Sequence, residues 1–155
     1  MKQVLVRSVY DAFEYVMGHY YPYGLEEMAE CADTYAVISI QDTHTDGFGI
    51  RFCENKFCKG VLTLYFDDIE KEIEGAVLFS DEQAGQIIDF ILEHKNVDTL
   101  LVHCYAGQSR SRAVGIFAAW MMELDTNDTA LAPAGNYNRH VLDTLQVVEI
   151  QREFT

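Results

Sequence analysis

Apolar positions along the chain follow two spacings, one typical of strands and one typical of helices. Short runs of aliphatic and β-branched residues predict strands at residues 4–6, 35–40, 61–66 and 100–103. Apolar residues at 84, 87, 88, 91 and 92 recur at helical spacing and follow Ser80 and Gln83, which fit a capping box. The chain therefore places an amphipathic helix between its last two predicted strands.

Three further helices are predicted from capping residues and apolar spacing. Ser8 is a suitable N-cap for a helix through about Gly18, with Val9, Phe13 and Val16 near helical spacing. An apolar helix runs from Arg110 to about residue 124. A last helix begins after Asn136 or Asn138 and ends near Val148. Polar, Pro-containing or Gly-containing segments predict a turn at 20–24, a loop at 42–49, and a loop or short helix at 125–135.

Strands and helices alternate along the whole length, which indicates an α/β fold. We expect residues 1–155 to form a single domain with a central, mostly parallel sheet of about four to five strands, flanked by helices on both faces. Ligands of such sheets bind at the carboxyl ends of the strands. Residues 104–110 lie at such an end, between a predicted strand and a predicted helix.

Composition and charge restrict the partners that this chain can bind. Of its 155 residues, 49% are hydrophobic, which is sufficient for a packed core, and the formal net charge is −14. Such an acidic surface repels nucleic acid phosphates and anionic lipids, so neither nucleic acid nor membrane is expected as a partner. An anionic substrate would need a local positive field.

The hydrophobic segments do not predict export or a membrane span. The apolar run at residues 113–122 is shorter than the roughly 20 residues that a bilayer requires. The first residues show no apolar core followed by a small-residue cleavage site. We expect a soluble cytoplasmic protein, and the sequence does not predict its oligomeric state.

The stretch HCYAGQSRS, residues 103–111, concentrates reactive side chains between two apolar segments. Five residues separate Cys104 from Arg110, so a short loop can turn its backbone N–H groups inward and form an anion site at a helix N-terminus. Gly107 lies where an unusual φ is needed. A positive field favours thiolate over thiol, and a guanidinium matches two phosphoryl oxygens.

This stretch matches the pattern H-C-x-x-G-x-x-R-S and resembles the active-site signature of cysteine-dependent protein tyrosine phosphatases, in particular the small dual-specificity branch. The resemblance is strongest over about residues 60–120 and implies a phosphatase-like domain that needs no metal or other cofactor. It implies that Cys104 attacks phosphorus, that Arg110 stabilises the transition state, that Ser111 assists the departing sulfur and that His103 supports the loop. The phosphate-contacting positions would be Tyr105, Ala106, Gly107, Gln108, Ser109 and Arg110.

The family reaction also needs a general acid from an upstream loop. Asp67 and Asp68, which end a predicted strand, lie 37 and 36 residues before Cys104 (104 − 67 and 104 − 68). The family pattern of an aspartate followed by an apolar or small residue favours Asp68, which precedes Ile69, and Asp67 stays the alternative.

The remaining cysteines suggest no established site. Without an export signal, the thiols of Cys31, Cys53, Cys58 and Cys104 are expected to be reduced. Cys53 and Cys58 have no second ligand pair that would complete a zinc site, so no metal is expected. Their role stays open. Arg112 is expected to be a surface charge or to pair with a neighbouring helix.

The uncharged loop positions Tyr105, Ala106, Gln108 and Ser109 disfavour a polyanionic substrate, and the net charge disfavours RNA. The expected substrate is a phosphorylated protein or peptide carrying phosphotyrosine, with phosphoserine and phosphothreonine as further candidates. The alternative is a module of the same fold that binds phosphate without efficient turnover. Low-molecular-weight phosphatases, which carry the motif near the N-terminus, are excluded because the loop lies two-thirds along the chain.

Overall fold

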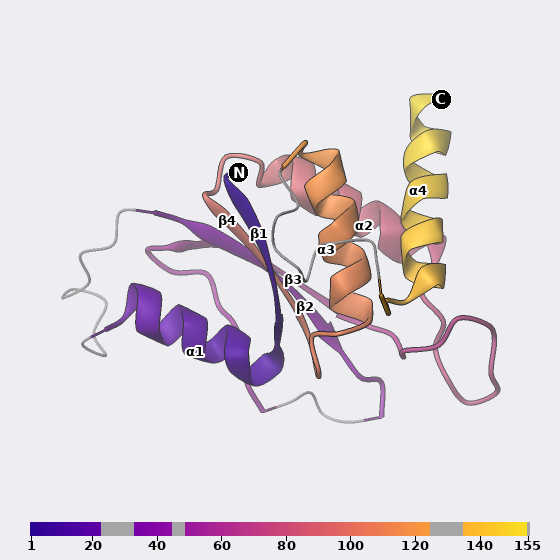
Figure 1. The fold of residues 1–155 in the computed structure, drawn as a ribbon, viewed down its shortest axis with the longest axis horizontal. Coiled ribbons are helices and arrows are strands. Elements are labelled where there is room, and N and C mark those ends of the chain that lie inside the picture. The colour runs from indigo at the N-terminus through magenta and orange to yellow at the C-terminus, as the bar shows by residue number, and fades with distance from the viewer. Residues whose placement is uncertain (23–32, 45–48, 125–134, 155) are drawn as a thin grey trace.

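The computed structural model describes residues 1–22, 33–44, 49–124 and 135–154 (Figure 1). Its elements in chain order are β1 (Gln3–Ser8), α1 (Val9–Tyr20), β2 (Tyr35–Gln41), β3 (Cys58–Tyr65), α2 (Asp81–Glu93), β4 (Thr99–Cys104), α3 (Arg110–Met121) and α4 (Arg139–Glu153). The predicted turn at 20–24, the loop at 42–49 and the segment at 125–135 fall partly outside the described residues.

The four strands form one sheet in the order β1-β4-β2-β3, and every neighbouring pair is parallel. The predicted α/β class with a mainly parallel sheet is therefore confirmed. β4 lies between β1 and β2, with Ser8 opposite Cys104 and Ser39 opposite His103. This register brings the carboxyl ends of β1, β4 and β2 together at the loop that follows Cys104.

Helices cover both faces of the sheet, as predicted (Figure 1). On one face, α1 packs through Val16 and Tyr20 on strand residues such as Val37 and Leu101. On the other face, α2, α3 and α4 enclose a larger core around Ile38 and Val102 and related residues. Burial of these apolar side chains is the main contribution that holds the sheet and helices together.

The predicted capping residues occupy the helix starts. The Ser8 hydroxyl accepts from the Asp11 N–H, Ser80 and Gln83 form a capping box, and the Asn138 side chain accepts from the Val141 N–H. Asn138 and not Asn136 therefore caps the last helix. Each cap satisfies an N–H group that has no partner within its helix.

Some predicted boundaries differ from the structure. β3 begins at Cys58 and not at Val61, because the Asn55 side chain accepts the N–H groups of Phe57 and Cys58 and turns the chain into the strand. α3 ends at Met121, whereas α4 extends beyond Val148 to Glu153. Its last turn is held to α2 by an ion pair between Arg152 and Asp89.

Phe13 is 43% exposed although its spacing suggested the buried face of α1, where Val9 and Val16 do lie. No helix in the described part of the chain combines the length and the apolar character that crossing a bilayer requires.

Candidate active site

The loop between β4 and α3 holds a buried thiol at its first position. Cys104 is 2% exposed, and its Sγ lies 3.1 Å from the Ser111 hydroxyl oxygen, which comes from the first turn of α3. The Gly107 N–H donates to the same sulfur at 3.3 Å. Both contacts place hydrogen-bonding groups directly beside the sulfur. The structure thus brings the predicted Cys104 and Ser111 together.

Gly107 has a φ of 71°, the left-handed conformation that only glycine adopts without strain. A Cβ built on it would lie 2.4 Å from the backbone nitrogen of Ser8 and 2.5 Å from the carbonyl carbon of Arg7. The Val9 N–H also donates to the Tyr105 carbonyl. The loop is therefore pressed against the junction of β1 and α1, where only a glycine fits.

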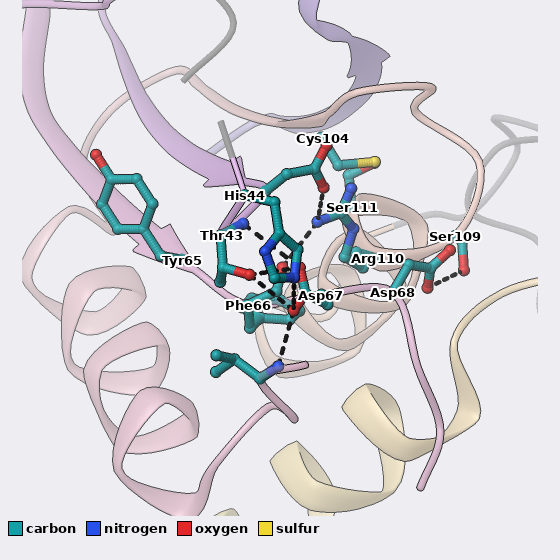
Figure 2. Close-up of polar contacts among 12 residues, drawn as sticks. Thr43, His44, Tyr65, Phe66, Asp67, Asp68, Cys104, Ser109, Arg110 and Ser111 are labelled. Carbon is teal, nitrogen blue, oxygen red and sulfur yellow. Dashed lines mark hydrogen bonds and ion pairs between the residues drawn. The ribbon is translucent and has the colours of Figure 1, made fainter. Parts of the chain in front are cut away.

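Arg110 begins α3 and is almost fully buried, so its charge needs partners. Its Nη1 group donates to the Phe66 carbonyl and contacts the Asp42 carboxylate, each at 2.8 Å (Figure 2). Nη2 and Nε make no hydrogen bond to any residue that the structure describes, which leaves one edge of the fork for an anion. Sequence reasoning missed Asp42. Its position two residues after the strand predicted at 35–40 was the available signal.

Asp67 and Asp68 are adjacent but point to different partners (Figure 2). The Asp67 carboxylate accepts from the Thr43 hydroxyl at 2.8 Å and from the Val77 N–H at 2.7 Å, and it lies 3.8 Å from the ring of His44. Burial alone would raise the pKa of Asp67, but the Val77 N–H and the Thr43 hydroxyl and N–H outweigh it and lower the pKa below its ordinary value. Asp67 is thus an ionised group that joins two loops.

Asp68 is exposed and contacts the loop itself. Its Oδ1 accepts from the Ser109 hydroxyl at 2.8 Å and from the Asn138 side-chain amide at 2.9 Å. Asn138 is buried, donates also to the Ile69 carbonyl and donates its backbone N–H to the Ser109 carbonyl. The helix α4 cap therefore connects the Asp68 segment to the loop, a role of Asn138 that sequence reasoning did not include.

His103 lies fully buried directly before Cys104. Its Nε2 is 2.7 Å from the Ser39 hydroxyl and its Nδ1 is 3.3 Å from the Cys104 carbonyl. Burial lowers the pKa of His103 to about 4; the contact with the Cys104 carbonyl opposes this shift, and the charge of Arg110 adds to it. The ring is therefore neutral near neutral pH, in keeping with a supporting group and not with a proton carrier.

The other loop positions lie nearer the surface. Tyr105, Ala106 and Gln108 are exposed, and the Tyr105 ring meets Tyr10 of α1 edge to face. Arg112 donates to the Asn136 carbonyl, so it connects α3 with the segment before α4.

The structure describes two cysteines besides Cys104. Cys53 is exposed and Cys58 is buried, both are free thiols, and Cys31 lies outside the described residues. Within the described ranges, no three His, Cys, Asp or Glu side chains are grouped so that they could hold a metal ion.

No protein-family model matches the chain, and no curated protein matches its sequence. Among solved structures, it is similar to OH1 from the Orf virus, described as a tyrosine phosphatase that displays distinct structural features and triple substrate specificity. The two chains share 16% identity with a TM-score of 0.47, over 99% of this chain and 72% of that chain. A match of this extent does not transfer an activity, which has to be judged from residues 103–111 and their contacts.

Proposed function

We propose that the protein is a phosphatase that hydrolyses phosphotyrosine in proteins or peptides through a phosphocysteine intermediate, with phosphoserine and phosphothreonine as further substrates. The observation that carries this proposal is the Cys104 sulfur at a strand end, with the Gly107 N–H at 3.3 Å, the Ser111 oxygen at 3.1 Å and Arg110 at the start of the next helix. A thiolate nucleophile, an anion site and a cationic clamp are thereby available within one short loop.

In the first step, the Cys104 thiolate attacks phosphorus, an S–P bond forms and the bond from phosphorus to the phenolic oxygen breaks. Asp68 gives its proton to that oxygen, so a neutral phenol leaves. The free edge of Arg110 and the backbone N–H groups of residues 105–109 stabilise the charge on the phosphoryl oxygens.

In the second step, water attacks the phosphorus of the intermediate and the S–P bond breaks. The Asp68 carboxylate takes up the proton from water, and the Ser111 hydroxyl donates a hydrogen bond to the departing thiolate. The products are inorganic phosphate and the free hydroxyl compound, and both Cys104 and Asp68 return to their initial states.

The choice of Asp68 as the acid rests on the different surroundings of the two carboxylates. Asp67 is held as a carboxylate by Thr43 and Val77 and has its pKa lowered, so it is poorly suited to donate a proton. Asp68 is exposed and reaches Ser109 of the loop. This contact also supports turnover over the alternative of a phosphate-binding module, which would need no acid beside the loop.

The test is the hydrolysis of p-nitrophenyl phosphate in the presence of a chelator, with vanadate as an inhibitor. We expect metal-independent turnover that falls by about 10³-fold or more in Cys104→Ser, because a serine hydroxyl is a far weaker nucleophile than a thiolate. A Cys104→Ser protein that keeps its activity would refute the mechanism. A wild-type protein that binds vanadate without turnover would support the binding module instead.

A further inference from the structure

Three buried polar side chains form a row on the α1 face of the sheet, close to its carboxyl edge. Ser39 of β2 and His103 of β4 are register partners, and Gln41 lies two residues further on the same face of β2. Two residues earlier on the same face, the register partners Val37 and Leu101 are apolar and belong to the core under α1. Ser39, Gln41 and His103 are 3%, 5% and 0% exposed, so each polar atom depends on a protein partner.

The contacts of this row fix the direction of each hydrogen bond. A carbonyl oxygen can only accept, so the contact between Nδ1 of His103 and the Cys104 carbonyl places the ring proton on Nδ1. Because the ring is neutral, Nε2 carries a lone pair and accepts from the Ser39 hydroxyl at 2.7 Å. The Ser39 oxygen in turn accepts from the Gln41 side-chain amide at 2.8 Å. The chain of donors runs from Gln41 through Ser39 and His103 to the backbone of Cys104.

The Gln41 side chain contains a group that lowers the stability of the fold. Its Oε1 is buried and has no hydrogen-bond partner in the structure described. A buried acceptor without a partner lowers stability, so an apolar side chain of similar volume would suit the fold better. The hydrogen bond that the Gln41 amide does make is the one to the Ser39 hydroxyl.

We propose that Ser39 and Gln41 are positioning residues that hold His103 in the Nδ1–H tautomer and thereby fix the first peptide of the loop after Cys104. A trans peptide directs its C=O and N–H groups to opposite sides. When the His103 ring holds the Cys104 carbonyl, it also sets the direction of the Tyr105 N–H, the first donor of the loop. This inference rests on the proposed function for its effect on catalysis, whereas the tautomer itself does not depend on any activity.

The tautomer is measured by long-range ¹H–¹⁵N correlation spectra of the protein labelled at histidine nitrogens, with the signals of residue 103 assigned from a His103→Gln variant. We expect a protonated Nδ1 and an unprotonated Nε2 in the wild type. In Ser39→Ala, Nε2 loses its donor, so we expect a mixture of tautomers. A wild-type ring with its proton on Nε2, or an unchanged tautomer in Ser39→Ala, would overturn the proposal.

Two further variants separate positioning from stability. Gln41→Met removes the unpaired oxygen, so the thermal midpoint should stay unchanged or rise while the share of the minor tautomer increases. Thr63→Ala is the matched control, because Thr63 is the register partner of Ser39 on β3 and is exposed. It should change neither the tautomer nor the activity.

Activity gives the second measurement. kcat/KM toward p-nitrophenyl phosphate should fall about 10-fold or more in Ser39→Ala, since a small misplacement of a catalytic loop has an effect of that size or larger. Wild-type activity in Ser39→Ala would count against the positioning role. If the wild type itself does not hydrolyse the ester, the proposed function fails, and the nitrogen spectra still decide whether the network sets the tautomer.

Discussion

The adjacent carboxylates of Asp67 and Asp68 have different hydrogen-bond partners, and these partners determine which of them can act as a proton donor. Asp67 accepts hydrogen bonds from two loops and is stabilised as an anion. Asp68 reaches outward to Ser109 and Asn138 and stays exposed to solvent. A proton donor must be able to reach the leaving group and must be able to carry a proton, and Asp68 meets the first condition better than Asp67.

Replacing each carboxylate in turn by its amide should show which of the two aspartates is the proton donor. We expect Asp68→Asn to lower kcat for p-nitrophenyl phosphate by about 10²-fold or more, because general acid catalysis contributes 10²–10⁴-fold. Asp67→Asn should retain most of kcat. Steady-state kinetics below neutral pH measure both, and a strong loss confined to Asp67→Asn would show that the acid has been assigned to the wrong residue.

The lowered pKa of Asp67 makes a separate prediction about stability. Because the folded protein holds this carboxyl below its ordinary pKa of about 3.9, its stabilising effect is complete above that value and is lost as the pH falls through the folded pKa. Asp67→Asn should therefore lower the free energy of unfolding by about 1–3 kcal/mol near neutrality. In urea titrations, the difference from the wild type should shrink in acid; a pH-independent difference would contradict this assignment.

At the scale of the elements, the residues at the starts of α3 and α4 also hold other segments of the chain in place. α3 starts with Arg110, whose guanidinium reaches the carboxyl ends of β2 and β3 through Asp42 and Phe66. α4 starts at its cap Asn138, which also holds Asp68 and Ile69. The segment of Asp68 and Ile69 and the loop after Cys104 are therefore kept in place by a residue that comes later in the chain than both.

Two single variants, each without one helix cap, should separate the hold of Asn138 on Asp68 from its capping of α4. Asn138→Ala and Ser80→Ala each lose an N-cap, which costs about 0.5–2 kcal/mol. Only Asn138→Ala also releases Asp68, so we expect its kcat to fall several-fold while Ser80→Ala keeps wild-type kcat. Urea unfolding and steady-state kinetics provide the two measurements, and equal kcat in both variants would mean that Asn138 is a cap and nothing more.

The order of elements was predictable because it depends on local patterns. Caps at Ser8 and Ser80, the strand at 35–40 and the spacing from Cys104 to Arg110 are all read within a few residues. The strand order was not predictable, because the pairing of β1 with β4 joins segments about a hundred residues apart and no local signal encodes it. Ser39 and Gln41 were missed for the same reason, since the register of β2 with β4 is what brings them beside His103.

At the scale of the whole molecule, the net charge of −14 opposes the approach of any phosphorylated substrate. Arg110 is paired with Asp42, which offsets its charge at a distance, so a peptide with acidic flanks is repelled by the overall charge before it arrives. The protein should therefore prefer phosphopeptides that carry basic residues around the modified side chain.

This preference is measured with matched phosphotyrosine peptides flanked by either Lys or Glu. We expect a several-fold higher kcat/KM for the basic peptide at low ionic strength, and we expect added salt to bring the two values together because it screens charges that lie apart. p-Nitrophenyl phosphate serves as the control for general salt effects. A preference that persists unchanged in high salt would point to direct contacts and not to the overall field.

The contact of Gly107 with Arg7 and Ser8 also has a consequence for the order in which the protein matures during synthesis. The loop is pressed against the end of β1, and in the described sheet β1 pairs with β4, whose last residue is Cys104. A nascent chain therefore cannot give the loop after Cys104 its final shape until β1 and β4 have paired. Under the proposed function, turnover would begin once this long-range pairing has formed, so activity would report the folding of the sheet.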